Sequence, residues 1–224
     1  MTTADSNDII LKIDNLNCGY GDKPVVDGFS LDVNKGDRIA ITGPNGCGKS
    51  TLLRAIYQLC IINSGDILYK GISLQGKTPE TIKKLGIAWF MQKNAIFSTL
   101  SVEENLRLAM NGLEFADRNL KLNEIIHQFP ELANRINTTA GLLSGGQRQQ
   151  LSFAMLLLQD ADLWLLDEPT AGLDKNNTEF FVNTFENLIG KTRENSKTVI
   201  FVEHKTEIIN HLATKKLELN NLIK

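Results

Sequence analysis

Between two apolar segments the chain reads Gly43-Pro44-Asn45-Gly46-Cys47-Gly48-Lys49-Ser50. This segment fits the phosphate-loop pattern G-x-x-x-x-G-K-[ST]. Its glycines let the backbone curl so that N–H groups point inward and bind phosphate oxygens. We expect Lys49 to place a positive charge beside the phosphates and Ser50 to offer a hydroxyl to Mg²⁺. The segment, with Thr51 directly after it, therefore predicts a nucleotide-binding site.

The sequence on both sides of this loop supports the prediction. Residues Arg38–Thr42 look like a strand, and its centre, Ile39–Ile41, is apolar on both faces, as in a buried parallel strand. A helical stretch follows from Lys49 to about Leu59 and directs its positive N-terminal end at the phosphates. The alternative is a chance glycine-rich turn, but such a turn would not need a strand before it and a helix after it.

Two acidic residues follow another apolar strand, at Leu163–Leu166. A strand that is buried on both faces delivers Asp167 to the carboxyl edge of the sheet, where open α/β folds bind their ligands. We expect Asp167 to hold Mg²⁺, through water, and Glu168 to polarise an attacking water molecule. An acidic turn in solvent is the alternative, and the nearby phosphate loop favours the catalytic interpretation.

The rest of the chain indicates an α/β fold with an inserted helical part. Short apolar runs predict further strands, and the run at Val199–Val202 is as apolar as the strand before the acidic pair. From about Lys93 to Asn137 we see no strand pattern. An acidic helix start follows Ser101, and a helical apolar stripe ends at Pro130. We expect one domain, 1–224, in which residues 93–150 form a helical subdomain. The other predicted strands are Ile9–Ile13, Leu31–Val33 and Ile87–Met91, and the stripe consists of Leu122, Ile125, Ile126 and Phe129.

Composition excludes some classes of function. The 224 residues carry a formal net charge of -2 and no block of Lys or Arg, so we expect no nucleic-acid partner. The three cysteines fit no metal or disulfide spacing and indicate reduced thiols in a cytosolic compartment. Residues Met1–Asn7 are polar, unlike a signal peptide, and no apolar run approaches the roughly 20 residues that span a bilayer. Any membrane part would have to come from another polypeptide.

A glycine-rich signature, Leu143-Ser144-Gly145-Gly146-Gln147, precedes the acidic pair. With the phosphate loop, the acidic pair and His204 in this order, the chain resembles the nucleotide-binding subunits of ABC transporters from about Ile9 to Leu217. Ser144 can cap a helix, and the glycines expose N–H groups at its positive end. The resemblance implies that this end binds the γ-phosphate of ATP held by a second cassette, in a head-to-tail homo- or heterodimer. It also implies a P-loop NTPase core with an N-terminal antiparallel β subdomain.

The resemblance assigns further residues one by one. Tyr20 stands where the family stacks an aromatic ring on adenine. Gln92 matches the glutamine that reaches Mg²⁺ and the lytic water, and that couples the site to the membrane partner. His204 matches the histidine that contacts the γ-phosphate and orients the attack. Asp174 lies in the loop that crosses the dimer interface, although Ala171 replaces the serine that is common there. Cys47 fills a variable position of the phosphate loop, where we expect a reactive thiol that ATP protects.

The function that the resemblance implies is ATP hydrolysis, with Mg²⁺, that energises solute transport through separate transmembrane permease subunits. Such a subunit lies on the cytoplasmic face of the membrane. Residues Ala95–Leu106 and Phe129–Leu132 look similar to cassettes that import branched-chain amino acids and urea. An export cassette, or a soluble ABC ATPase of iron–sulfur assembly, remains an alternative. A non-hydrolysing interaction module would be expected to lack Lys49, Asp167 or Glu168, and all three are present.

Overall fold

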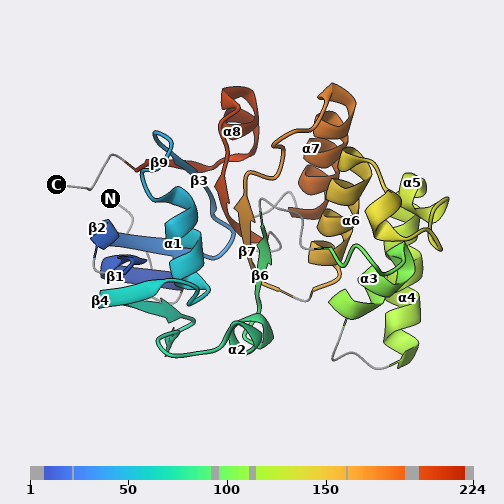
Figure 1. The fold of residues 1–224 in the computed structure, drawn as a ribbon. Helices are drawn as coiled ribbons and strands as arrows, with labels where there is room; N and C mark the ends of the chain where they lie inside the picture. Colours follow the sequence, from blue (N-terminus) through green and yellow to red (C-terminus); the bar gives the residue numbers. More distant parts are fainter. Residues whose placement is uncertain are drawn as a thin grey trace.

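A computed structural model describes residues 8–21, 23–91, 96–110, 115–159, 161–189 and 197–219. Its centre is a parallel sheet of five strands, which brings together segments from both ends of the chain (Figure 1). In spatial order its strands are β6 (Ile87–Phe90), β7 (Leu163–Asp167), β8 (Thr198–Val202), β3 (Arg38–Thr42) and β9 (Lys215–Glu218).

A second sheet is antiparallel and is built mainly from the N-terminal part of the chain (Figure 1). Its strands are β2 (Lys23–Asn34), β1 (Ile9–Tyr20), β4 (Ile61–Tyr69) and β5 (Ile72–Ser73), in this spatial order. The predicted strands Ile9–Ile13 and Leu31–Val33 are parts of the much longer strands β1 and β2. The turn at Gly36, with φ 77°, separates the two sheets, because β2 ends before it and β3 begins after it.

Helix α1 (Lys49–Ile56) lies between the two sheets and packs its apolar side chains against both. The alternation of side chains along β7 shows why this strand is apolar throughout. Leu163 and Leu165 belong to the core on the side of α1, while Trp164 and Leu166 belong to the core on the other face. The helix is shorter than predicted, because Gln58 adopts a left-handed conformation, with φ 56°, soon after it.

The other face of the parallel sheet is covered by helices, and those between β6 and β7 extend the molecule to one side (Figure 1). The predicted apolar stripe is confirmed, with Leu122, Ile125 and Phe129 buried. Pro130 follows the end of α4 and also begins α5, where its fixed φ suits the first turn. The helices are α2 (Pro79–Lys84), α3 (Val102–Ala109), α4 (Phe115–Gln128), α5 (Pro130–Ala133), a 3-10 turn (Ala140–Leu142), α6 (Gly145–Leu157), α7 (Lys175–Ile189) and α8 (Thr206–Leu212).

The predicted fold class is confirmed: an α/β core with a parallel sheet, an antiparallel β subdomain and a helical insert. Helix α6, which follows the helical insert, runs from Gly145 to Leu157. The phosphate loop joins β3 to α1, and Asp167 ends β7 beside β8. The parallel sheet therefore brings residues from three distant parts of the sequence to one edge.

Candidate nucleotide site

The phosphate loop needs glycine at defined positions. Gly43 and Gly48 have φ values of 137° and 104°, which L side chains rarely adopt. A Cβ atom at Gly43 would lie 2.3 Å from the Leu219 carbonyl oxygen, and one at Gly48 would lie 3.0 Å from Val26. Gly46, with φ 82°, has open space at its Cβ position and lines the cleft in front of the loop. The backbone of the loop therefore requires glycine at positions 43 and 48.

Lys49 is buried, and its ammonium lies inside the curve of the loop. Nζ donates hydrogen bonds of 2.8 Å to the carbonyl oxygens of Gly43 and Pro44. The loop borders an open cleft of about 520 Å³, into which the ends of β7 and β8 also bring side chains. This cleft is lined by Asn45, Gly46, Gly48, Lys49, Ser50, Thr51, Glu168 and His204.

Asp167 and Ser50 meet beside this cleft, although they are 117 positions apart in the sequence. The Ser50 hydroxyl donates to Asp167 Oδ1 at 2.9 Å. Burial raises the pKa of Asp167, and the hydrogen bond from Ser50 opposes this shift. A hydroxyl and a carboxylate are both hard oxygen donors, so this pair fits a hard divalent cation such as Mg²⁺.

Glu168 and His204, two residues with separately predicted roles, form a second pair at this edge. Nε2 of His204 lies 3.2 Å from Oε1 of Glu168, and the two residues follow neighbouring strands. Glu168 has a φ of 50°, a left-handed conformation that is unusual outside glycine, and its N–H donates to the Val202 carbonyl oxygen at 3.0 Å. Such strain is concentrated at functional sites. It turns the Glu168 side chain toward the cleft while Asp167 stays buried in the sheet.

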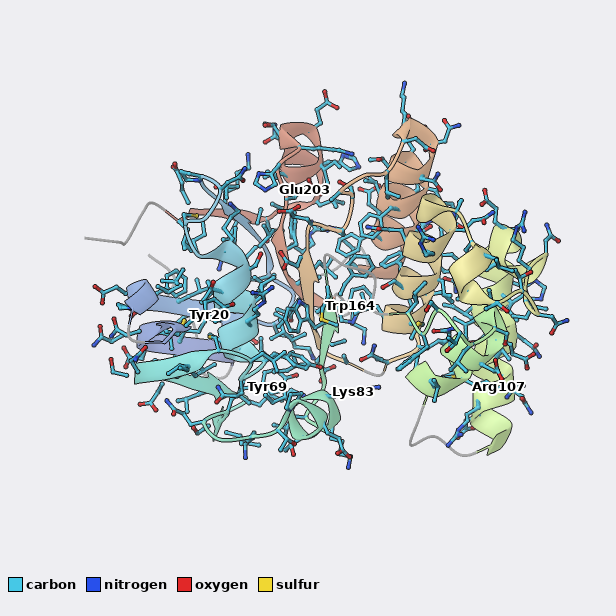
Figure 2. All side chains as sticks on the ribbon, viewed as in Figure 1. Tyr20, Tyr69, Lys83, Arg107, Trp164 and Glu203 are labelled. Carbon is cyan, nitrogen blue, oxygen red and sulfur yellow. The ribbon has the colours of Figure 1, made fainter. Side chains whose placement is uncertain are left out.

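Tyr20 lies at the end of β1, with 48% of its surface exposed (Figure 2). Its hydroxyl accepts a hydrogen bond of 2.6 Å from Nη1 of Arg54, and the guanidinium carbon is 5.9 Å from the ring centroid. Arg54 was not predicted from the sequence as a site residue. Its position on α1, the helix that follows the phosphate loop, was the only available signal.

The expectation of a reactive thiol at Cys47 is wrong. Its side chain is fully buried, and Sγ lies 4.0 Å from Nζ of Lys49 on the inner side of the loop. A thiol without solvent contact is closed to reagents whether or not a nucleotide is bound. Gln92 lies outside the described residues, so the structure does not place it.

The signature residues lie at the start of α6, apart from the side chains that line the cleft. The predicted cap is present: Ser144 Oγ accepts from the N–H of Gln147 at 3.2 Å, and the Gln147 side chain accepts from the N–H of Ser144 at 3.1 Å. Gly145 is exposed at the same helix end. Gly146 faces Asn177 so closely that a Cβ would lie 2.8 Å from the Asn177 side chain.

Asp174 lies just before α7 and receives hydrogen bonds from the backbone and side chain of Asn177, the backbone one at 2.8 Å. These bonds hold the pKa of Asp174 below its usual value. Since Gln150 of α6 also donates to the Asn177 side chain at 3.0 Å, the Asp174 loop and the signature helix share a partner. The structure thus brings Asp174 close to the signature and leaves both outside the cleft lining.

The phosphate loop at a parallel sheet edge, the acidic pair and a capped signature helix together define a P-loop ATPase of the ATP-binding-cassette class. Residues 26–171 match the family model described as ABC transporter, and the chain belongs to this family. It is the ATP-binding and ATP-hydrolysing subunit of an ABC transporter, which energises transport. The family match and the relatives described next therefore favour the transport function over the alternative of a soluble iron–sulfur assembly ATPase.

Two curated relatives illustrate the similarity. The chain is 35% identical to the probable branched-chain amino acid transport ATP-binding protein LivF of Archaeoglobus fulgidus, over 88% of this chain and 83% of the relative. It is 32% identical to the high-affinity branched-chain amino acid transport ATP-binding protein BraG of Pseudomonas aeruginosa, over 95% and 89%.

Solved structures share the fold. An ATP-binding subunit of an ABC transporter superimposes with a TM-score of 0.83 at 25% identity, covering 95% of this chain and 86% of the other. A dimeric bacterial ABC transporter cassette superimposes with a TM-score of 0.81 at 23% identity, covering 94% of both chains. None of the helices in the described part of the chain is both long and apolar enough to cross a membrane.

Proposed function

We propose that this chain hydrolyses ATP in the cleft between the phosphate loop and the ends of β7 and β8. The observation that carries the proposal is the contact of 3.2 Å between His204 and Glu168 at the edge of a cleft that Lys49 also lines. Glu168 takes the role of polarising the attacking water, and His204 orients that attack near the γ-phosphate. Lys49 holds the phosphates with the backbone N–H groups of the loop.

The donor chemistry beside the loop supports Mg²⁺ as the cofactor. Ser50 and Asp167 would hold the ion, with Gln92 as a further proposed ligand. Among the described residues no group of three or more His, Cys, Asp or Glu could hold a metal, so phosphate and water oxygens would complete the shell. Bound Mg²⁺ would neutralise charge on the phosphates.

A second cassette completes the site in this proposal. Ser144, Gly145, Gly146 and Gln147 offer a capped helix end that lies outside the cleft of their own chain, which supports their binding the γ-phosphate held by a partner. Asp174 would cross the same interface, and Tyr20 would stack on adenine. Closure of two cassettes around ATP is the step that would move attached membrane subunits.

The proposed membrane partner is a separate permease on another polypeptide, and the proposed solute class is branched-chain amino acids. Two relatives that cover most of this chain carry that transport role in their names. Co-purification tests the proposed permease partner, and solute uptake tests the proposed solute class.

The first test is capture of partners from native membranes. Tagged Glu168→Gln with MgATP, which should hold the closed state, is incubated with detergent-solubilised membranes of the source organism. We expect a multi-spanning permease to co-purify, and disruption of the gene for this chain should reduce uptake of radiolabelled leucine. Recovery of soluble proteins alone would contradict the permease partner, while unchanged leucine uptake beside a captured permease would contradict only the solute class.

A further inference from the structure

Glu203 is a buried carboxylate to which the proposed chemistry assigns no role. It lies between the last residue of β8 and His204, and only 4% of its surface is exposed. Figure 2 shows it beneath α8, at the upper end of the central strands. Burial of a charged side chain is costly unless hydrogen bonds compensate, so the partners of Glu203 indicate what its position serves.

The two carboxylate oxygens of Glu203 hold two different segments. Oε1 accepts hydrogen bonds from the backbone N–H groups of His204, at 2.8 Å, and Lys205, at 3.1 Å. Oε2 accepts from the hydroxyl of Thr170 at 2.6 Å. Thr170 is fully buried and comes two residues after Glu168. A single side chain therefore joins the backbone at His204 to the segment that carries Glu168.

Lys205 makes a second connection between the same segments. Its Nζ donates to the carbonyl oxygen of Thr170 at 3.3 Å and to the hydroxyl of Thr178, on α7, at 3.2 Å. From the other side, the side chain of Gln149 on α6 donates to the carbonyl oxygen of Pro169. The segment after Glu168 is thus held between the signature helix and the His204 loop.

The side chain of His204 needs support of this kind, because 45% of it is exposed. Few packed neighbours fix an exposed ring, so its position depends on where its backbone is held. We propose that Glu203 and Thr170 are positioning residues that set His204 at its distance from Glu168. This inference rests on the proposed roles of Glu168 and His204 in hydrolysis, and it adds the residues that align them.

The main test is Thr170→Val, which removes the hydroxyl at nearly constant volume. We expect kcat for ATP hydrolysis to fall roughly ten- to hundredfold, because small displacements of catalytic groups cost about that much. The Kd for a fluorescent ATP analogue should stay at the parent value, since Thr170 does not line the cleft. Thr170→Ser restores the hydroxyl and should recover most of kcat. Unchanged kcat in Thr170→Val would overturn the proposal.

A matched control is available on β8, the strand that precedes Glu203. Thr198, at the opposite end of β8, is also buried, and its hydroxyl accepts from the N–H of Gly36 at 3.0 Å. Thr198→Val should destabilise the protein to a similar degree but keep the parent kcat. If both valine variants lower kcat equally, the effect of Thr170 is general destabilisation and the positioning role is wrong.

A double variant distinguishes this proposal from the proposed function. In a His204→Ala background, Thr170→Val should lower kcat no further, because residues that act through one another are not additive. A full additional loss would contradict action through His204. If Thr170→Val does not fold, Glu203→Gln replaces it, with the same expectation for kcat and Kd and with unchanged kcat as the contrary result. Parent-like hydrolysis by Glu168→Gln would instead overturn the proposed function.

Discussion

Tyr20 presents an exposed ring at the end of β1, while Arg54 holds its hydroxyl. If the ring stacks on adenine, Tyr20→Ala should raise the Kd for ATP about tenfold, which corresponds to the usual strength of base–aromatic stacking. Tyr20→Phe keeps the ring and should change the Kd much less. Titration with a fluorescent ATP analogue measures both values, and equal affinities in parent and Tyr20→Ala would exclude stacking.

The cysteines differ sharply in their surroundings. Hydrogen bonding to Cys60, with burial, raises the pKa of Cys18, whereas the hydrogen bond from Cys18 and the charge of Arg54 lower the pKa of Cys60. A lowered pKa increases the thiolate fraction at neutral pH, and Cys60 is also partly exposed. We therefore expect iodoacetamide to label Cys60 before the other two cysteines. Mass spectrometry of the labelled protein over time measures the order of labelling. Early labelling of Cys47 that ATP prevents would contradict the burial of that thiol.

At the residue scale, sequence predicts the groups that local patterns define. The phosphate loop and the acidic pair fall within short segments whose neighbours confirm their context. Glu203 and Thr170 were not predicted, because their hydrogen bond joins residues 33 positions apart. Arg54 was missed for the same reason, since its contact with Tyr20 depends on how α1 packs beside β1. The buried state of Cys47 also depends on packing that the motif does not encode.

Helices α3 and α6 both begin with a capping box, which gives a comparison at the element scale. Ser101 caps α3 with Glu104, and Ser144 caps α6 with Gln147. Replacement of either serine by alanine should lower the free energy of unfolding by about 1 kcal/mol, measured by urea denaturation. Only Ser144→Ala should also weaken ATP-driven association of cassettes, measured by analytical ultracentrifugation. Equal association of cassettes by both variants would contradict the proposal that the signature lies in the interface.

Element predictions succeeded where one periodicity dominates. The stripe on α4 and the apolar runs of β7 and β8 were found because packing on one side or on both gives a clear pattern. Strand β4 was not predicted. Its first six residues are exposed or half-buried, and Gly65, with φ 87°, interrupts it where a Cβ would lie 2.4 Å from the Asn15 carbonyl oxygen. Such irregular pairing weakens the alternation that identifies a strand.

At the scale of the molecule, an ion pair between Lys70 and Asp162 joins the two sheets. Lys70, just after β4, lies 2.5 Å from Asp162, just before β7. The bond lowers the pKa of Asp162 and raises that of Lys70. Its stabilisation should therefore exist near neutral pH, disappear as the pH falls through the lowered pKa of Asp162, and disappear again as the pH rises through the raised pKa of Lys70.

Both side chains are about half exposed, so Lys70→Met should cost at most about 1 kcal/mol at pH 7 in urea unfolding. Lys84→Met removes an ion pair within α2 and serves as the control, with a smaller effect expected. A cost for Lys70→Met that is unchanged at strongly acidic pH would show that lost packing, not charge, is responsible.

The whole fold was predicted through the family resemblance more than through composition. Periodicity alone gave a parallel core and a helical insert, whereas the antiparallel sheet followed from the signature, the phosphate loop and their order. The second cassette and the permease could not be predicted in this way, because contacts within one chain do not specify a partner. The signature helix end outside the cleft is the feature of this chain that points to one.

In the proposed mechanism Glu168 is required for hydrolysis, while ATP binding depends on other residues of the site. The most direct test compares Glu168→Gln with the parent chain for Kd of a fluorescent ATP analogue and for phosphate release at saturating MgATP. We predict a Kd no higher than that of the parent chain and a loss of hydrolysis of roughly a hundredfold or more, in the range typical of general-base removal. Hydrolysis at the parent rate would contradict the account.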